Sequence, residues 1–316
     1  MVVTHGALTG SPGATAASPG GWAVTIGNFD GVHRGHRALL ERVVALGRER
    51  NLGSCVLTFE PHPREFFTPA AAPARITRLR DKLELMADAG IGRVHVARFD
   101  ARLAAMPAPE FVEDVLVRGL AMRRLLVGRD FRYGKGRAGD FATLERAGAQ
   151  LGFGVEAMPD VQAAGERVSS SAVRAALAGG DLARAATLLG RRYSISGRVA
   201  HGEKLGRELG CPTANIVLRR APPLSGIYVV EVEVEEGHAR HRGVASVGRR
   251  PTVNPTARPL LEAHLFDFNE DLYGKHLRVS VLAKLRDEEK YSDLEQLKRA
   301  IAADVAAARA WFEKNG

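Results

Sequence analysis

Short apolar runs alternate with amphipathic segments along the first 190 residues. Five runs, at 22–27, 54–59, 93–97, 124–128 and 154–158, are continuous enough to be strands buried on both faces. Between them helical periodicity appears near 36–46, 78–88, 108–118, 141–150 and 170–178. This repeated strand–helix order predicts an α/β domain with a parallel sheet that helices cover on both faces.

After Gly190 the helical segments disappear and strands follow one another. Six are expected, at 193–200, 213–218, 226–235, 242–247, 260–268 and 277–285. Residues 230–235 alternate Val and Glu, as in a strand with one buried and one wet face. The pattern predicts a six-stranded antiparallel β-barrel. A terminal helix follows, with a capping box at Ser292 and Glu295.

The change of pattern near residues 180–192 predicts two domains, at 22–188 and 189–316. Residues 1–21 are rich in Gly, Ala, Ser, Thr and Pro. They lack the basic start and apolar core of a signal peptide, so we expect a flexible N-terminal tail. A chain of 316 residues is long enough for two domains.

Charge and composition narrow the class of protein. The net charge of +9 divides into +5 for residues 1–188 and +4 for the rest, so no basic arm of the nucleic-acid-binding kind stands out. The mild excess suits phosphate-bearing small molecules. No apolar stretch reaches membrane-spanning length. Cys55 and Cys211 have no partners at metal-ligand spacing. We expect a cytoplasmic enzyme or binding protein.

The densest chemical signal is the loop over residues 27–36, with sequence GNFDGVHRGH. It follows a predicted strand and opens a predicted helix, where backbone N–H groups and the helix dipole favour phosphate. His33 and His36 are three residues apart, so both imidazoles emerge on one side of the first turn. Such a pair can stabilise charge on a triphosphate. The alternative is a Gly-rich turn followed by surface histidines.

Two further pieces of the first half follow strands or open helices. His62 lies in the sequence FEPHP, after the second strand, where open α/β sheets bind ligands; it could equally be an ordinary loop histidine. Residues 168–174, VSSSAVR, place serines and Arg174 at a helix start. We expect one serine to cap the helix, and the others could bind phosphate.

Residues 134–139 satisfy the pattern G-x-G-x-x-G, and Glu156 follows about 20 residues later, as in dinucleotide-binding folds. That fingerprint needs its glycines in the first tight turn after a strand, and residues 129–133 intervene. Gly128–Lys135 also has the wrong spacing for a P-loop. We therefore interpret the segment as a mobile, basic substrate loop.

The first half, residues 22–200, resembles the N-terminal half of the bacterial bifunctional riboflavin kinase/FMN adenylyltransferase (FAD synthetase) family. The carriers are the segments 25–36, 58–63, 127–131 with 133–134, and 169–171 with Arg174. The resemblance implies a Rossmann-like nucleotidyltransferase domain that passes the adenylyl group of ATP to FMN. It implies ATP or phosphate contacts for Gly27, Asn28, Phe29, His33, His36, Ser170, Ser171 and Arg174, and flavin contacts for His62, Asp130 and Tyr133. Ser171 and Tyr133 replace the family's usual Thr and Phe.

In the second half, a glycine-rich flap over residues 197–216 could form a phosphate-binding backbone nest. Thr213 and Asn215 alternate onto one strand face, where two oxygens could reach a hard cation. Glu262 interrupts an apolar strand; if buried, it would have a raised pKa and suit general-base work. The alternatives are a long hairpin loop and a surface-facing Glu262 on an edge strand.

Residues 193–312 resemble the riboflavin kinase module, through Gly206, 209–215, 226–228, 247–252, Glu262, 272–274 and 285–288. The resemblance implies transfer of the γ-phosphoryl group of ATP to the riboflavin 5′-hydroxyl. Glu262 would be the base, Thr213 and Asn215 would hold Mg²⁺, and Gly206 with Thr213 and Asn215 would contact phosphate. Cys211 replaces an aromatic or larger apolar residue that is common in the family.

Three hypotheses follow. The first is a bifunctional flavin enzyme with ATP as co-substrate, Mg²⁺ as cofactor, riboflavin and FMN as substrates, and neither nucleic acid nor membrane as partner. The second is the same enzyme with one inactive site. The third is a flavin or nucleic-acid binder without catalysis, for which the basic charge is the only direct support. The sequence leaves the oligomeric state open.

Overall fold

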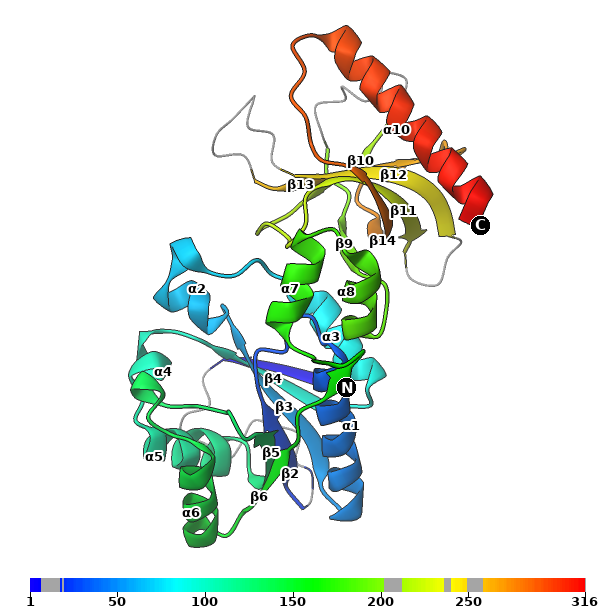
Figure 1. The fold of residues 1–316 in the computed structure, drawn as a ribbon. Helices are drawn as coiled ribbons and strands as arrows, with labels where there is room; N and C mark the ends of the chain where they lie inside the picture. Colours follow the sequence, from blue (N-terminus) through cyan, green and yellow to red (C-terminus); the bar gives the residue numbers. More distant parts are fainter. Residues whose placement is uncertain (7–17, 19, 202–211, 236–239, 249–257, 316) are drawn as a thin grey trace. The chain divides into compact units, whose positions relative to one another are not determined.

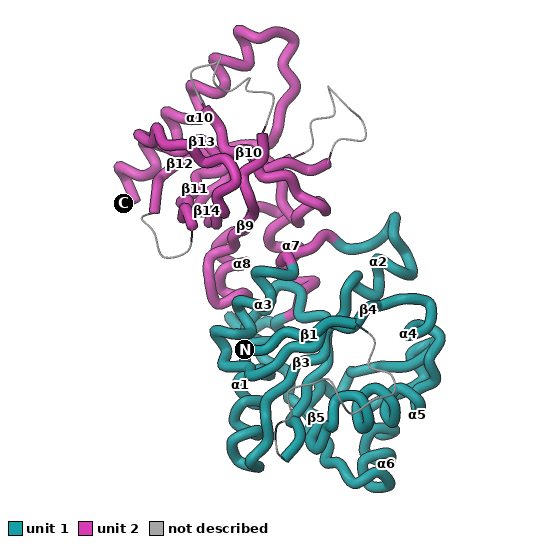
Figure 2. The backbone as a smooth tube through the Cα atoms, turned by 180° about the vertical axis from the view of Figure 1, so that it is seen from behind, with its two compact units in different colours: residues 1–73, 79–168 teal, residues 74–78, 169–316 magenta. Residues whose placement is uncertain are grey.

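The computed structural model describes residues 1–6, 18, 20–201, 212–235, 240–248 and 258–315. The chain forms two compact units, which Figure 2 shows in different colours. The first unit contains residues 1–73 and 79–168, and the second contains residues 74–78 and 169–316. The boundary between the units thus lies about twenty residues before the predicted domain boundary at residue 189. The reason is that the two helices that follow residue 169 pack with the second unit.

The first unit is built on a six-stranded sheet whose strands all run parallel. The spatial order is β1-β4-β3-β2-β5-β6 (Figure 1). The strands are β1 Val2–Gly6, β2 Trp22–Ile26, β3 Gly53–Glu60, β4 Arg93–Arg98, β5 Met122–Gly128 and β6 Gly154–Met158. The five strands expected after residue 22 and the parallel sheet are confirmed.

Both faces of this sheet are covered, as continuous apolar strands require. Successive strand residues alternate between two buried clusters, so Val24 packs with the π-helix η2 on one face while Ala23 packs with α1 on the other. The helical segments are α1 Arg34–Glu49, α2 Pro63–Phe67, η1 Pro69–Ala71, α3 Leu79–Asp88, α4 Ala101–Ala105, α5 Ala108–Glu110, η2 Phe111–Gly119, η3 Lys135–Arg137 and α6 Phe141–Leu151. A short hairpin, β7 Gln162–Ala163 and β8 Glu166–Arg167, follows β6.

The expectation of a flexible tail is wrong for its first residues. Val2–Gly6 form strand β1, which pairs in parallel with β4 at the edge of the sheet. The hydroxyl of Thr4 lies 2.8 Å from Nδ1 of His95 on β4. Two β-branched valines and a threonine favour a strand, but five residues are too few to stand out from a Gly- and Ala-rich surrounding. Residues 7–17 and 19 lie outside the described part.

The second unit contains a six-stranded antiparallel sheet that curls into a nearly closed barrel. The order is β10-β13-β12-β11-β14-β9, and a bridge between Ala200 and Asn215 links its two end strands. The strands are β9 Ser194–Arg198, β10 Ala214–Val217, β11 Gly226–Val234, β12 Arg240–Gly248, β13 Leu260–Leu265 and β14 His276–Arg286. The six predicted strands are all present, and the alternation of buried valines with half-buried glutamates on β11 is confirmed.

The described part of this unit also contains the helices α7 Ser170–Ala178, α8 Leu182–Leu189 and α10 Leu294–Asn315. The predicted terminal helix exists, but its cap differs. The carboxylate of Asp293 accepts a hydrogen bond of 2.8 Å from the backbone N–H of Gln296, so Asp293 caps the helix in place of Ser292. Asp293 lies one position after Ser292, and its charged carboxylate binds a free backbone N–H group at the start of the helix in place of the serine hydroxyl.

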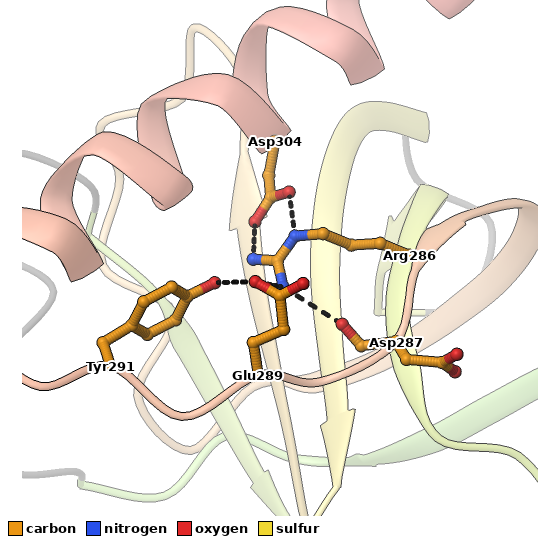
Figure 3. Close-up of polar contacts among 5 residues, drawn as sticks. All are labelled: Arg286, Asp287, Glu289, Tyr291 and Asp304. Carbon is orange, nitrogen blue, oxygen red and sulfur yellow. Dashed lines mark hydrogen bonds and ion pairs between the residues drawn. The ribbon is translucent and has the colours of Figure 1, made fainter.

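A paired arginine and aspartate join α10 to the barrel (Figure 3). Arg286, the last residue of β14, donates two hydrogen bonds of 2.8 and 2.6 Å to the carboxylate of Asp304. Asp304 is 8% exposed, and the paired carboxylate raises the pKa of Arg286 further. The bidentate pair adds geometric specificity to the apolar contacts of Ala308 and Phe312.

In the part of the chain that the structure describes, every helix is too short or too polar to cross a membrane.

Candidate active sites

The loop between β2 and α1 is held in an unusual backbone conformation. Phe29 and Val32 have φ angles of 49° and 38°, and Gly31 has a φ of 92°. Left-handed values at a phenylalanine and a valine cost of order 1–3 kcal/mol each and persist only where packing demands them. Both side chains are buried in the core cluster that α1 covers. The loop is thus a fixed turn at the carboxyl ends of the strands.

His33 and His36 come together at the start of α1. Their rings stack with centroids 3.6 Å apart and an interplanar angle of 12°. His33 is the N-cap residue, and its Nδ1 accepts a hydrogen bond of 3.2 Å from the backbone N–H of His36. His33 is buried, so the interpretation as two independent surface histidines is wrong for this ring. This cap hydrogen bond fixes the orientation of the His33 ring at the N-terminus of α1, where the sequence predicted the histidine to lie.

Gly35 and Asn28 complete this side of the loop. A Cβ at Gly35 would lie 3.3 Å from two ring atoms of His33, so the absence of a side chain lets the imidazole lie against the helix. The side-chain oxygen Oδ1 of Asn28 is buried and has no hydrogen-bond partner among the described residues. Burying an amide oxygen unpaired is costly, which points to a donor that a ligand would supply.

His62 is a helix cap. Its Nδ1 accepts a hydrogen bond of 3.1 Å from the backbone N–H of Arg64, and its own backbone N–H donates to the carboxylate of Glu65 at 3.2 Å. The two bonds form a capping box at the start of α2. The structure therefore gives His62 the role of a helix cap.

Tyr133 belongs to the core, whereas Asp130 is exposed. The Tyr133 ring lies against Phe131 and Phe111, and its hydroxyl is 3.2 Å from that of Thr143; burial raises its pKa. Asp130 forms an ion pair of 2.8 Å with Arg167. These contacts hold the loop after β5 and leave little of Tyr133 for a ligand.

The glycines of the G-x-G-x-x-G segment serve turns. Gly134 and Gly136 have φ angles of 72° and 64°, and a Cβ on Gly134 would lie 2.7 Å from the backbone of Ala108. Backbone pairing between Tyr133 and Gly139 closes the segment into a small loop. The segment thus does not form the tight strand–helix turn of a dinucleotide fingerprint.

One of the three serines at the start of α7 caps the helix, as expected. Ser169 accepts a hydrogen bond of 3.1 Å from the backbone N–H of Ala172. Arg174 donates 2.8 Å to the carbonyl oxygen of Ala74. Ser171 is exposed and Ser170 half-buried. All four residues belong to the second compact unit, whereas the histidines belong to the first.

Strand pairing brings the candidate residues of the barrel together. Asn215 on β10 is directly opposite Glu262 on β13, and Ser246 on β12 is opposite Glu262 on its other side. Residues directly opposite in an antiparallel pair share a face, with Cβ atoms about 4.5–5.5 Å apart. Thr213 precedes β10 by one residue, and its carbonyl oxygen accepts a hydrogen bond of 3.3 Å from the Asn215 side-chain amide.

Glu262 is neither fully buried nor on an edge strand. Its neighbours Leu261 and Ala263 point into the barrel core, and Glu262 occupies the opposite, half-buried face of a strand with partners on both sides. The expected buried carboxylate is thus corrected to a half-buried one. Its apolar neighbours in sequence reflect the alternation of a strand with one buried face.

A second carboxylate, Glu288, lies near Glu262, and it was not predicted to be a site residue. Burial and then the charge of Glu262 raise the pKa of Glu288. A Cβ on Gly248 would lie 1.9 Å from a Glu288 carboxylate oxygen, so the glycine makes room for this group. Glu288 follows the end of β14 and lies 26 residues from Glu262 in sequence, so spacing along the chain does not indicate that the two carboxylates are neighbours.

The described residues offer hard oxygen donors but no classical metal cluster. They contain no group of three or more His, Cys, Asp or Glu side chains placed to hold a metal ion. The hydroxyl of Thr213, the amide oxygen of Asn215 and the carboxylate of Glu262 are nevertheless of the type that Mg²⁺ prefers. Gly206, expected to contact phosphate, lies outside the described residues.

Comparison with known proteins supports both halves. Residues 15–172 match a family model described as FAD synthetase, and residues 189–312 match one described as riboflavin kinase. Proteins described as bifunctional riboflavin kinase/FMN adenylyltransferase from Escherichia coli (strain K12) and Pseudomonas fluorescens are 49% and 50% identical to the chain. Each alignment covers 92% of the chain and 93% of the relative.

A solved structure supports the fold as a whole. The crystal structure of a protein described as a macrolide-efflux protein from Streptococcus pneumoniae has a TM-score of 0.78 and 26% sequence identity, covering 98% of the chain and 100% of that protein. The description belongs to that protein. The match extends over both compact units, so the α/β domain followed by the barrel is an arrangement already seen in a single chain.

Proposed function

The chain belongs to the bifunctional riboflavin kinase/FMN adenylyltransferase family, and we propose how its two halves divide the work. The barrel, from about residue 189, phosphorylates riboflavin to FMN with ATP. The α/β domain, residues 22–188, transfers the adenylyl group of ATP to FMN, giving FAD and pyrophosphate. The observation that supports this division of the two reactions is that each unit has its own cluster of polar residues. The first unit has the stacked pair His33 and His36, and the second has Asn215 paired with Glu262.

In the kinase step, Glu262 accepts the proton of the riboflavin 5′-hydroxyl. Glu262 is half-buried on a strand paired on both sides, so its backbone is fixed beside Asn215, and a general base has to be positioned in this way. Thr213 and Asn215 would hold Mg²⁺ together with the phosphate oxygens, and the ion would neutralise charge on the transferred group. Gly206 is proposed as a further phosphate contact. Glu288 lies near this base, and burial together with the charge of Glu262 raises the pKa of Glu288.

In the adenylyl-transfer step, His33 and His36 donate hydrogen bonds to the phosphates of ATP. Their rings are stacked at the N-terminus of α1, where the helix dipole also favours negative charge. Gly27, Asn28 and Phe29 would form the wall of the ATP site, and the buried Oδ1 of Asn28 would accept a bond from the nucleotide. Alignment and charge stabilisation suffice for such a transfer.

Three further roles rest on the family resemblance. Ser170, Ser171 and Arg174 would supply a second phosphate contact. His62 and Asp130 would face the flavin, while Tyr133 would position the loop from its buried place rather than touch the ligand. We also propose that the protein works in the cytoplasm on free riboflavin, FMN and ATP.

The test is to incubate the purified chain with riboflavin, ATP and Mg²⁺ and to separate the flavins by chromatography. FAD is the expected product. FMN alone would indicate one inactive site, and unchanged riboflavin would exclude both activities and favour a binding protein. A parallel incubation with FMN and ATP isolates the second step.

A further inference from the structure

The first unit has an arginine-lined hollow at the edge of the sheet where β5 and β6 begin. It is an open hollow of about 490 Å³, a volume within the range of small-molecule sites. We call it the arginine hollow and define it by its lining, which consists of Arg50, Leu52, Arg123, Arg124, Gly148, Gly152, Phe153 and Gly154. Helices α1 and α6 end at this edge (Figure 1). The histidine loop follows the carboxyl end of β2, at the opposite edge.

The charge of the arginine hollow is strongly positive. Its lining contains three arginines and no carboxylate. Within the described ranges, no aspartate or glutamate forms an ion pair with Arg50, Arg123 or Arg124. The carboxyl ends of α1 and α6 each contribute roughly −0.5 of a charge, so a surplus of about two positive charges is left. Three arginine side chains that line one open hollow without a counter-charge form a positive patch that attracts anions.

Glycines keep the arginines in place. A Cβ on Gly154 would lie 1.9 Å from Nη1 of Arg124, and a Cβ on Gly21 would lie 2.8 Å from Cγ of Arg123. A side chain at Gly154 would displace the guanidinium group of Arg124, and one at Gly21 would displace the aliphatic stem of Arg123. Gly152 ends α6 in the left-handed conformation, with a φ of 77°, and opens the wall next to Gly154. The hollow is therefore shaped by backbone that carries no side chains.

We propose that the arginine hollow binds a small anion carrying at least two phosphate groups. Guanidinium groups are planar forks that match phosphate oxygens in pairs and stay charged at every physiological pH. Three forks in 490 Å³ offer more donors and more room than one phosphate can use. Seven residues of β5 span roughly 20 Å, so this site is separate from the proposed adenylyl-transfer site, and the proposal does not depend on that reaction.

The probe is pyrophosphate, titrated calorimetrically into the full chain without flavin, nucleotide or Mg²⁺. The chain carries His33→Ala and His36→Ala, so that the histidine pair does not contribute. In this background Arg50→Gln and Arg123→Gln should each weaken binding at least about fivefold, and together at least about 20-fold, a tenfold loss being ~1.4 kcal/mol. Both side chains are exposed, so their replacement should leave the thermal unfolding temperature unchanged.

Arg48→Gln is the matched control, because Arg48 is an exposed arginine in the last turn of the same helix, outside the hollow. It should alter the pyrophosphate affinity less than twofold, and inorganic phosphate should bind at least tenfold more weakly than pyrophosphate. Equal losses for Arg48→Gln and Arg50→Gln would overturn the proposal, because general surface charge would then explain binding. Unchanged binding in both hollow variants, or equal binding of phosphate and pyrophosphate, would also overturn it.

Should a glutamine variant unfold, Arg50→Lys and Arg123→Lys keep the charge but lose the fork. They should weaken pyrophosphate binding about threefold each, since a lysine makes a point contact where arginine makes two bonds. If both lysine variants bound pyrophosphate as tightly as the parent chain, the proposal that arginine guanidinium groups recognise the phosphates would be wrong.

Discussion

The two polar clusters of this protein are assembled by different means. In the α/β unit, His33 and His36 are neighbours within one helical turn, and a cap hydrogen bond between the two residues fixes them. In the barrel, Asn215 and Glu262 are far apart in sequence and meet only because β10 pairs with β13 in one register. The first site is built from local geometry and the second from long-range pairing.

This difference predicts that the two clusters can be damaged separately. A local site depends on one turn and its packing, whereas a register-dependent site depends on the whole barrel. A substitution in one unit should therefore change the reaction or the thermal transition of that unit and leave those of the other unit unchanged.

The largest expected effect is that of Glu262→Gln on FMN formation. The amide cannot accept the hydroxyl proton, and the loss of a general base costs about 10²–10⁴-fold in rate. FAD formation from supplied FMN should persist. Both rates are measured by chromatographic separation of flavins under saturating ATP.

Glu233→Gln is the matched control for Glu262→Gln, since Glu233 is a half-buried glutamate on the wet face of β11 in the same barrel. It should leave both steps intact. A folded Glu262→Gln protein that had lost FAD synthesis as well would show that the two sites are not independent.

The converse change is His33→Ala with His36→Ala. Loss of preorganised donors to a transition-state charge costs about 10²–10³-fold each, so FAD synthesis should fall below detection while FMN formation continues. His5→Ala, at an exposed histidine of β1, serves as the control. FAD synthesis at the parental rate in the double variant would remove the histidines from the mechanism.

The contrast between local and long-range assembly also explains what the sequence could predict. The histidine pair and the serine cap at Ser169 follow from spacing at a helix start, and the structure confirms both geometries. Strands and helices of regular period were found within a few residues. The strand β1 was not predicted, because five residues show too little periodicity and their pairing with β4 cannot be read from the sequence.

Side-chain environments were harder to predict than elements. Glu262 looked buried because its neighbours in sequence are apolar, yet its face of the strand is half-exposed. Tyr133 looked like a flavin contact but fills the core. Glu288 was not a candidate, since its place near Glu262 depends on how the segment after β14 folds back beside β13. Each of these depends on which face of an element a residue occupies.

Asp304→Asn tests whether the barrel unfolds by itself. It removes the charge that pairs with Arg286 and leaves a half-buried guanidinium without its carboxylate, at an expected cost of about 2–3 kcal/mol. The thermal transition of the barrel should move down, while FAD synthesis from FMN is retained at 25 °C. Calorimetry of the full chain separates the two transitions.

A second bidentate pair, Asp267 with Arg309, joins the same helix to the barrel but is exposed. Asp267→Asn should leave the transition almost unchanged, because solvent screens exposed pairs. If both substitutions lowered the transition equally, burial would not be what distinguishes these pairs. If Asp304→Asn also moved the transition of the α/β unit, the two units would not be thermally independent.

The smallest expected effect is a pH dependence confined to the α/β unit. His95 on β4 is 3% exposed, and burial lowers its pKa to about 4. The unfolded chain takes up this proton near the ordinary pKa of about 6.5. The folded unit therefore binds fewer protons between these values, and the stability that neutral His95 contributes is complete above pH 6.5 and is lost as the pH falls towards 4. At pH 5 the loss should be about 1–2 kcal/mol.

His95→Gln should flatten the pH dependence of the thermal transition of the α/β unit between pH 7 and 5 and leave that of the barrel unchanged. The control His5→Gln should leave the pH dependence of both transitions as it is in the parent chain. An unaltered slope in His95→Gln would mean that the acid sensitivity of this unit arises elsewhere than where β1 joins the sheet.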